Sequence, residues 1–444
     1  MSKQTKLNLF DLTMIVIGLV IGLGIFRTSK DAAAASLSPL IFFGAWVVGG
    51  LVAFCGALTY AEIGSRYPVT GGYYKIFSYA YHPSIAFAIN CVILISNAAS
   101  LSGVALIGSE YISQLIFTAE PSPFIKSLIA MSAIIAFYGV NMMGLRISTR
   151  VLNILMIVKV GLLIMIISAL FFPNLYHPAN AARSAGNENF WQILLSFGIA
   201  LKAASFTYGG YQQTINFGEE IENPKRNIPR GVFMGILIII VLYLAVSFSY
   251  YKIIGFEELK QANGIASIVA EKMFGATGKT IVSVLLFIAV LAYVNVILLS
   301  NPRVMYAMSD DGILPPSFKK KDEKKDVLTV SLTVFAGICV VVLFFADTFD
   351  QILSFSIFLD SVGMATSAAT IFVLRKKTKH LDGTGIYTIR FYPLMPLFFV
   401  LAYTFVGTII AISFPKYAVI GTSVFAFFLI VYFVVRKMGK NKKQ

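Results

Sequence analysis

Long apolar segments dominate the sequence and limit the folds that the chain can adopt. Hydrophobic residues make up 57% of the 444 residues and charged residues only 13%, whereas soluble domains carry about 25% charged residues. A helix of about 20 apolar residues crosses the hydrocarbon core of a membrane with all its backbone groups paired. The sequence therefore predicts an all-α integral membrane protein. The twelve spanning segments expected are 12–35, 40–62, 84–113, 124–145, 150–172, 191–217, 230–252, 279–308, 328–346, 350–374, 391–413 and 417–435.

The basic residues are distributed unevenly between the two sides of the membrane. With an even number of spans, both termini and alternate loops share one side, and that side holds 25 of the 36 Lys and Arg residues. Basic residues accumulate in cytoplasmic loops, so both termini are predicted to be cytoplasmic. The compact loops and the lack of cysteine in the outer loops favour the cell's inner (plasma) membrane. The net charge of +15 thus reflects the membrane topology, and some of the basic residues would contact anionic lipid. It does not indicate nucleic-acid binding.

Two of the apolar segments are interrupted by glycines. The first segment contains Gly18, Gly22 and Gly24, and the sixth contains the pair Gly209-Gly210. Glycines in such positions serve either close helix packing or an unwound stretch that faces a ligand at mid-membrane. Two interruptions five segments apart favour the second interpretation and an inverted repeat. No residue-level repetition accompanies them, so the repeat rests on segment order: 12–174 and 191–374, then two additional helices in 391–436 and a basic tail, 437–444.

The cysteines and histidines offer no catalytic or metal site in the sequence. Cys55, Cys91 and Cys339 all fall inside apolar segments, where a buried small side chain is expected, and a disulfide-linked partner subunit is not. The three histidines are far apart in the sequence. Enzymatic activity, a bound metal and a cofactor are therefore not expected. The sequence also lacks the repeated filter or the charged ring that a channel would need.

Several ordered motifs carry a family resemblance. They are Gly22–Phe26, Tyr60–Gly64, Thr70–Tyr73, Glu219–Pro229 and Arg303–Pro315. These stretches are spread along most of the chain in the order and spacing of a known family. They resemble the amino acid–polyamine–organocation superfamily and, within it, the amino acid permeases related to the L-type exchangers.

The resemblance implies a LeuT-type fold of five plus five helices with segments one and six unwound. The substrate would lie at mid-membrane between segments one, three, six, eight and ten. It implies a secondary active amino acid transporter that is sodium-independent and works as an exchanger or a proton-coupled symporter. The alternative is a permease for polyamines or other organic cations. One departure is Leu23, which stands where the family usually has serine, so a hydroxyl contact to the substrate is lost while a backbone contact is kept.

An unwound helix can bind an amino acid zwitterion without side-chain charges. Its free N–H groups suit a carboxylate and its free C=O groups suit an ammonium, and both charges are costly to bury unpaired. The expected backbone contacts are the amides of Leu23, Gly24 and Ile25 with the carboxylate, and the carbonyls of Val20, Phe206 and Gly209 with the ammonium.

The side chain of Phe206 has a separate expected role. It stands where the family has an aromatic lid between the site and the outside, and the alternative is that it only packs against its neighbours.

Two charged residues lie within predicted spans. A charge at the centre of a membrane helix costs roughly 2.5–3.5 kcal/mol on insertion scales and is usually functional. Lys159 resembles the family's substitute for a sodium ion between segments one and five, acting as a fixed charge or as a proton carrier. Asp360 would select a cationic or hydrogen-bonding substrate side chain, carry a coupling proton, or pair internally.

Four further polar residues complete the candidate site. Asn97 and Asn295 would be either polar groups of the pocket or interhelical hydrogen-bonding residues. Glu219 and Glu220 lie near basic residues at the cytoplasmic end of segment six, where ion pairs of an inner gate are expected.

Overall fold

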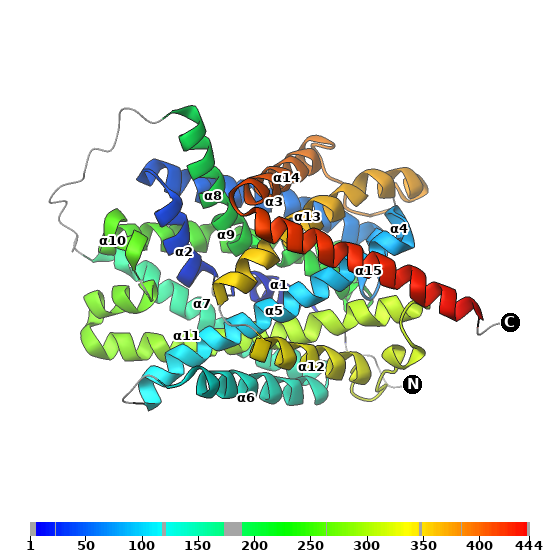
Figure 1. The fold of residues 1–444 in the computed structure, drawn as a ribbon, viewed down its shortest axis with the longest axis horizontal. Helices are drawn as coiled ribbons and strands as arrows, with labels where there is room; N and C mark the ends of the chain where they lie inside the picture. Colours follow the sequence, from blue (N-terminus) through cyan, green and yellow to red (C-terminus); the bar gives the residue numbers. More distant parts are fainter. Residues whose placement is uncertain are drawn as a thin grey trace.

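The structure, a computed structural model, describes residues 6–22, 24–117, 121–172, 189–262, 264–345, 349–382 and 384–441. These residues form helices and connecting segments (Figure 1). The α-helices are α1 (Leu9–Val20), α2 (Gly24–Ala35), α3 (Pro39–Arg66), α4 (Gly72–Ala80), α5 (Pro83–Ile116), α6 (Pro123–Met142), α7 (Leu145–Ile167), α8 (Phe190–Tyr208), α9 (Pro224–Ile254), α10 (Phe256–Gln261), α11 (Ile265–Asp310), α12 (Thr329–Phe345), α13 (Phe349–Lys377), α14 (Leu394–Ser413) and α15 (Pro415–Asn441). Short 3-10 helices are η1 (Ser168–Phe171), η2 (Tyr211–Asn216), η3 (Gly218–Glu220), η4 (Pro316–Lys319) and η5 (Lys379–Leu381).

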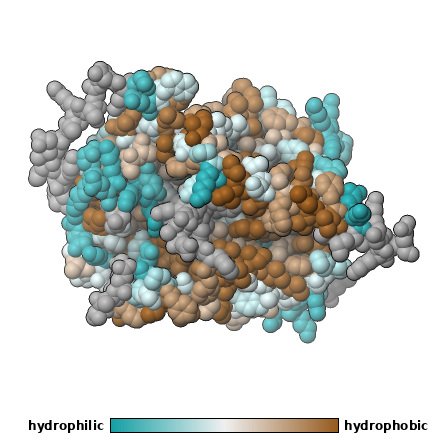
Figure 2. All heavy atoms as spheres, viewed as in Figure 1, coloured by the Kyte–Doolittle hydropathy of each residue, from teal (hydrophilic) through white to brown (hydrophobic). Residues whose placement is uncertain are grey.

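The helices are long enough and apolar enough for a membrane protein. Within the described ranges, 10 helices could cross a membrane, and α1 with α2 adds one more if the bent pair is a single span. The remaining apolar helix, α12, is shorter. Figure 2 shows hydrophobic residues over much of the middle of one face and hydrophilic residues toward the ends of the long axis. A lipid environment stabilises an apolar surface of this kind.

Local sequence signals explain where several of these helices begin. Ser38, His82 and Ser122 each place a side-chain acceptor before a proline that opens a helix. Both features suit the first turn, whose N–H groups have no partner inside the helix. The short helix α4 begins at Gly72, directly after Gly71, whose φ of 66° suits a glycine. We call the end of the molecule where α3, α11 and α15 finish the terminal side.

Two segments run further than their apolar cores predicted. Helix α11 begins at Ile265, before the expected start at 279, and it is divided by a kink at Gly275, whose φ of 70° and ψ of −162° are not helical. A glycine adopts this backbone conformation without steric cost. Helix α15 reaches Asn441, so the first residues of the expected basic tail are helical.

The interruptions of segments one and six are both present. Segment one is divided into α1 and α2, which are bent by 40°. Segment six is divided into α8 and η2 by Gly209 and Gly210. Around them, α3 packs against α8 and α9, and α11 packs against α5 and α7. The two breaks therefore lie inside the helix bundle rather than at its surface.

Candidate functional site

The two helix breaks touch each other through their backbones. Gly210 has φ of 116°, and a Cβ added there would lie 2.2 Å from the carbonyl oxygen of Leu19. A Cβ on Gly24 would lie 3.2 Å from the Cα of Thr207. Beside this contact, the hydroxyls of Thr28 and Thr207 are 2.5 Å apart. Only glycine permits so close an approach, which explains why both breaks contain glycine.

The first break leaves backbone carbonyl groups at the end of α1 and backbone amide groups at the start of α2 without partners inside a helix. The carbonyl of Val20 accepts hydrogen bonds from the Gly22 amide at 2.8 Å and from the Tyr243 hydroxyl at 3.2 Å. The carbonyl of Ile21 accepts from the ammonium of Lys159 at 2.5 Å. Helix α2 restarts at Gly24, so the amides of its first turn lack intrahelical acceptors. Among the residues expected here, Leu23 lies outside the described part of the chain.

The second break has partners from α8 and α14. The Gly209 amide donates to the carbonyl of Phe206 at 3.1 Å. The hydroxyl of Tyr403 donates to the carbonyl of Ser205 at 3.3 Å, and the Gly210 amide donates to Oε1 of Gln212 at 2.8 Å. The turn is thus held from both sides, which fixes its shape without a regular helix.

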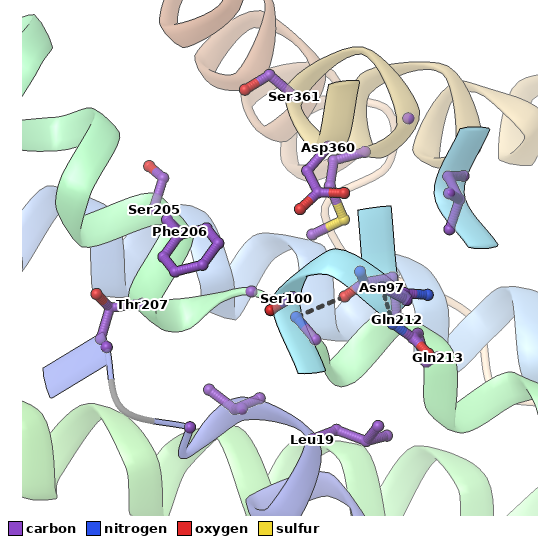
Figure 3. A pocket seen from close by; sticks show the side chains of 18 of the residues that line it. Leu19, Asn97, Ser100, Ser205, Phe206, Thr207, Gln212, Gln213, Asp360 and Ser361 are labelled. Atoms are coloured by element: carbon purple, nitrogen blue, oxygen red, sulfur yellow. Dashed lines mark hydrogen bonds between the residues drawn. The ribbon is translucent and has the colours of Figure 1, made fainter. Parts of the chain in front are cut away.

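A cavity lies between the breaks and helices α5, α11 and α13. It encloses about 1080 Å³ of empty space, part of it open to solvent. Figure 3 shows Asp360 entering it from α13, opposite Leu19, with Phe206 and Thr207 on α8. The structure brings most of the expected site residues to this lining, namely Val20, Gly24, Asn97, Phe206, Gly209 and Asp360. Ile25 is buried behind the lining.

Asp360 accepts a hydrogen bond from one hydroxyl, and three tyrosines line the cavity with it. Ser96 donates to its carboxylate at 3.2 Å, and Tyr73, Tyr293 and Tyr403 line the same cavity. A carboxylate beside several donors can also bind a cationic or hydrogen-bonding group of a ligand. Its location in the cavity is compatible with selecting a substrate side chain and with carrying a coupling proton.

The sequence interpretation missed several lining residues. Gln212 and Gln213 follow the glycine pair after Tyr211, and Ser100 lies one helical turn from Asn97. That three- to four-residue spacing places Asn97 and Ser100 on one face of α5, which was a usable signal. Gln213 donates to Oδ1 of Asn97 at 3.1 Å, and Asn97 donates to Asn301 at 2.7 Å. Asn97 therefore both lines the cavity and links helices.

Asn295 lies elsewhere. Its Oδ1 accepts from Asn141 at 2.8 Å and from Ser148 at 3.1 Å, and its amide donates to the Ser148 carbonyl at 3.1 Å. These bonds join α11 to α6 and α7. The structure does not bring Asn295 to the cavity, and its contacts are those of an interhelical hydrogen-bonding residue.

Lys159 lies behind the first break. Its side chain is fully buried in α7, and its ammonium reaches across to α1 through the Ile21 carbonyl. Six residues earlier on α7, Asn153 donates to Oδ1 of Asp11 at 2.7 Å. Segments one and five are therefore joined at two levels, and the ammonium stands at the C-terminal end of α1, where a helix carries partial negative charge.

An ion pair closes the terminal side of segment six. The Arg303 guanidinium binds Glu220 through Nε at 2.9 Å and a terminal nitrogen at 2.5 Å, and it stacks 4.3 Å above the Phe217 ring. Leu7 adds backbone hydrogen bonds to Glu220 and Glu222 on the same segment. Glu219 is exposed and accepts from Thr70 at 2.9 Å. Both glutamates thus lie at the terminal side of the bundle.

A second buried ion network ties α3 to α13. Glu62 is fully buried and binds Arg66 at 2.6 Å and Arg375 at 2.7 Å. It also accepts from the Ile389 amide at 2.7 Å. Arg66 extends the network to Asp382 at 2.8 Å. Two groups of buried charges therefore link the helices at the terminal side.

We expect Glu62→Gln to destabilise the folded protein by about 3–5 kcal/mol, because removing one partner leaves a buried arginine without its carboxylate. Thermal unfolding followed by size-exclusion chromatography measures the change. Glu257→Gln is the matched control, since its pair with Lys260 at 2.9 Å lies at the surface and such pairs contribute about 0–1 kcal/mol. Equal losses in the two variants would contradict the structural role of the network.

A bundle of membrane helices with two broken members meeting at a polar cavity is the architecture of a secondary transporter. Residues 7–435 match the amino acid permease family, and the chain belongs to it. It is a transporter and not an enzyme.

Curated relatives align along most of the chain. The serine/threonine exchanger SteT of Bacillus subtilis is 27% identical over 408 residues, which cover 90% of this chain and 90% of the relative. Asc-type amino acid transporter 1 of Mus musculus is 24% identical over 438 residues, covering 97% of this chain and 82% of the relative. The branched-chain amino acid permease BcaP of Bacillus subtilis is 28% identical over 345 residues, covering 73% and 71%.

Proposed function

We propose that this permease is a secondary active transporter that moves an amino acid across the inner (plasma) membrane by alternating access. Its twelve spans would form two inverted five-helix repeats, 12–174 and 191–374, followed by two further helices. Both termini would be cytoplasmic. The observation that carries the proposal is the meeting of two helix breaks at one polar cavity, a site suited to a zwitterion.

The substrate's charged groups would bind to backbone groups at the breaks. The amides at the start of α2, from Leu23 to Ile25, would donate to the carboxylate, and a helix N-terminus favours an anion there. The carbonyls of Phe206 and Gly209 would accept from the ammonium. The carbonyl of Val20 already has two donors, so its contact with the ammonium would require one of them to move away.

Lys159 would make transport independent of sodium. Its ammonium occupies the space between α1 and α7 and neutralises the carbonyl end of α1. A bound cation there would have to displace a buried positive charge. If the protein is an exchanger, this lysine would act as a fixed charge. If it is a proton-coupled symporter, the lysine would carry the proton.

The alternating access cycle would use the two ends of segment six. Phe206 lines the cavity and would act as the lid toward the outside. The pair of Glu220 with Arg303, assisted by Glu219, would form the inner gate. In this structure the pair is formed, which corresponds to a cavity closed toward the terminal side.

Uptake by proteoliposomes tests the proposal. Purified protein is reconstituted and supplied with radiolabelled amino acids, with sodium or choline as the external cation. We expect saturable uptake that is equal in the two cations. Stimulation by internal unlabelled substrate indicates exchange, and stimulation by an inward proton gradient indicates symport. Conductance without saturation would contradict a transporter.

The organic-cation alternative rests on Asp360, the carboxylate in the cavity. We expect Asp360→Asn to lower affinity for basic amino acids at least about tenfold relative to neutral ones, because a charge-assisted hydrogen bond is worth about 1.5–3 kcal/mol. Competition against labelled substrate by lysine, serine and putrescine measures the change. Ser361→Ala, at the neighbouring lining position, is the control. Unchanged selectivity in Asp360→Asn would exclude a selective role.

A further inference from the structure

A second cavity lies directly behind the substrate cavity. It has about 610 Å³ of empty space between α5, α13 and α15, part of it open to the surface of the bundle, and is lined almost entirely by apolar side chains. Its one hydroxyl-bearing residue, Thr422, donates to the Ala418 carbonyl at 2.8 Å, so no polar group is left to orient a ligand. We call this space the rear cavity. Its lining is Ile89, Val92, Ile93, Phe358, Leu359, Val362, Gly363, Gly421, Thr422 and Phe425.

The two cavities share a thin wall. Ile93 of α5 and Gly363 of α13 line both of them. A Cβ on Gly363 would lie 3.3 Å from Cδ1 of Ile93, so the isoleucine packs directly onto a bare stretch of backbone. The partition at this point consists of one side chain and one glycine.

Helix α13 therefore has two functional faces. Asp360 and Met364 face the substrate cavity, whereas Leu359 and Val362 face the rear cavity. The wall lies on the helices that stand across the cavity from the two breaks. A substrate held by its charged groups at the breaks would extend its side chain toward this wall.

We propose that Ile93 and Gly363 set the upper size limit of the substrate side chain, and that the rear cavity is apolar space which becomes usable when this wall is thinned. This inference rests on the proposed function. In the wild type, Ile93 separates the two spaces and restricts the substrates to amino acids with small or medium side chains. Truncating Ile93 joins the cavities and admits aromatic side chains.

Substrate competition gives the first test. Inhibition of labelled alanine uptake is measured with phenylalanine and with serine, in proteoliposomes. We expect Ile93→Ala to improve phenylalanine relative to serine at least about tenfold, since each methylene accommodated in an apolar pocket changes discrimination by about 10- to 200-fold. Gly363→Ala, which thickens the wall, changes the ratio in the opposite direction.

Matched controls separate the wall from general loosening. Ile297→Ala removes the same atoms from the substrate cavity, but Ile297 does not border the rear cavity. Val92→Ala removes atoms from the rear cavity alone. Neither variant should improve phenylalanine relative to serine. An equal gain in Ile297→Ala, or no gain in a folded Ile93→Ala, would overturn the inference.

A second readout requires no transport. With Cys55, Cys91 and Cys339 replaced by alanine, Leu359→Cys places a thiol on the rear cavity only. A water-soluble methanethiosulfonate, present on both sides of the vesicle membrane, should label this thiol when Ile93 is replaced by alanine and leave it unlabelled when Ile93 is retained. Equal labelling with and without Ile93 would overturn the partition. A wild-type protein that transports no amino acid would instead contradict the proposed function, while labelling still decides the partition.

Discussion

Lys159→Ala should reduce amino acid uptake by roughly tenfold to hundredfold. The lysine is fully buried and donates to the Ile21 carbonyl at 2.5 Å, and a hydrogen bond to a charged group contributes about 1.5–3 kcal/mol. Without it, the last carbonyls of α1 lose their cation in a region where water is scarce. The broken end of α1 would then no longer be held in the geometry that receives the substrate.

Uptake of labelled substrate by proteoliposomes, with the amount of folded protein fixed by size-exclusion chromatography, measures this effect. Lys202→Ala is the control, because Lys202 is also a lysine on a spanning segment but lies 4.6 Å above the Phe414 ring, away from the first break. Near-normal uptake in Lys159→Ala would exclude a role for its charge. Sodium-dependent uptake gained by Lys159→Ala would show that the ammonium occupies a cation position.

The residues that sequence reasoning could single out are those whose location in a membrane is physically costly. A buried charge such as Lys159 or Asp360 must have a reason to be there, so each could be singled out without a structure. The glycine pair of segment six was equally informative, because Gly210 has φ of 116°, a conformation that other residues rarely adopt. Asp360 and this glycine pair both line the cavity between the two helix breaks.

Features that depend on which helix faces which could not be predicted. Asn295 is polar and lies in an apolar segment, as Asn97 does, and helical periodicity alone does not decide which of them faces the cavity. The structure separates them, since Asn295 binds Ser148 and Asn141 instead. The wall formed by Ile93 and Gly363 was invisible for the same reason, because its thinness comes from two helices distant in sequence.

Segment boundaries were least predictable in the connection before segment eight. That stretch contains Gly264 and Gly275, which read as turn signals. In the structure Gly264 directly precedes the first helical residue, Ile265, and Gly275 leaves the helical conformation with φ of 70°. A helix therefore fills the residues between the two glycines, and the expected start of segment eight at 279 lies just after the kink.

Gly24→Val should abolish substrate binding. A Cβ at this position would lie 2.9 Å from Cγ2 of Thr207 and 3.2 Å from its Cα, and the branched valine side chain adds two further methyl groups. Both atoms belong to Thr207 of the other broken segment. The extra volume would therefore push the two breaks apart and cover the amides at the start of α2. Overpacking of this kind costs about 1–3 kcal/mol, and the substrate would also lose its carboxylate contact.

Thermal stabilisation by an amino acid panel measures binding directly, because a ligand at 100 times its Kd adds about 2.7 kcal/mol to the stability of the folded state. We expect that shift to disappear in Gly24→Val while the protein still elutes as a folded species. Gly161→Val is the matched control, since a Cβ on Gly161 of α7 meets nothing within 4 Å, and it should keep the shift. If Gly24→Val retained the wild-type affinity, the glycines of segment one would serve helix packing, as Gly18 does where its added Cβ would lie 3.3 Å from Sδ of Met156.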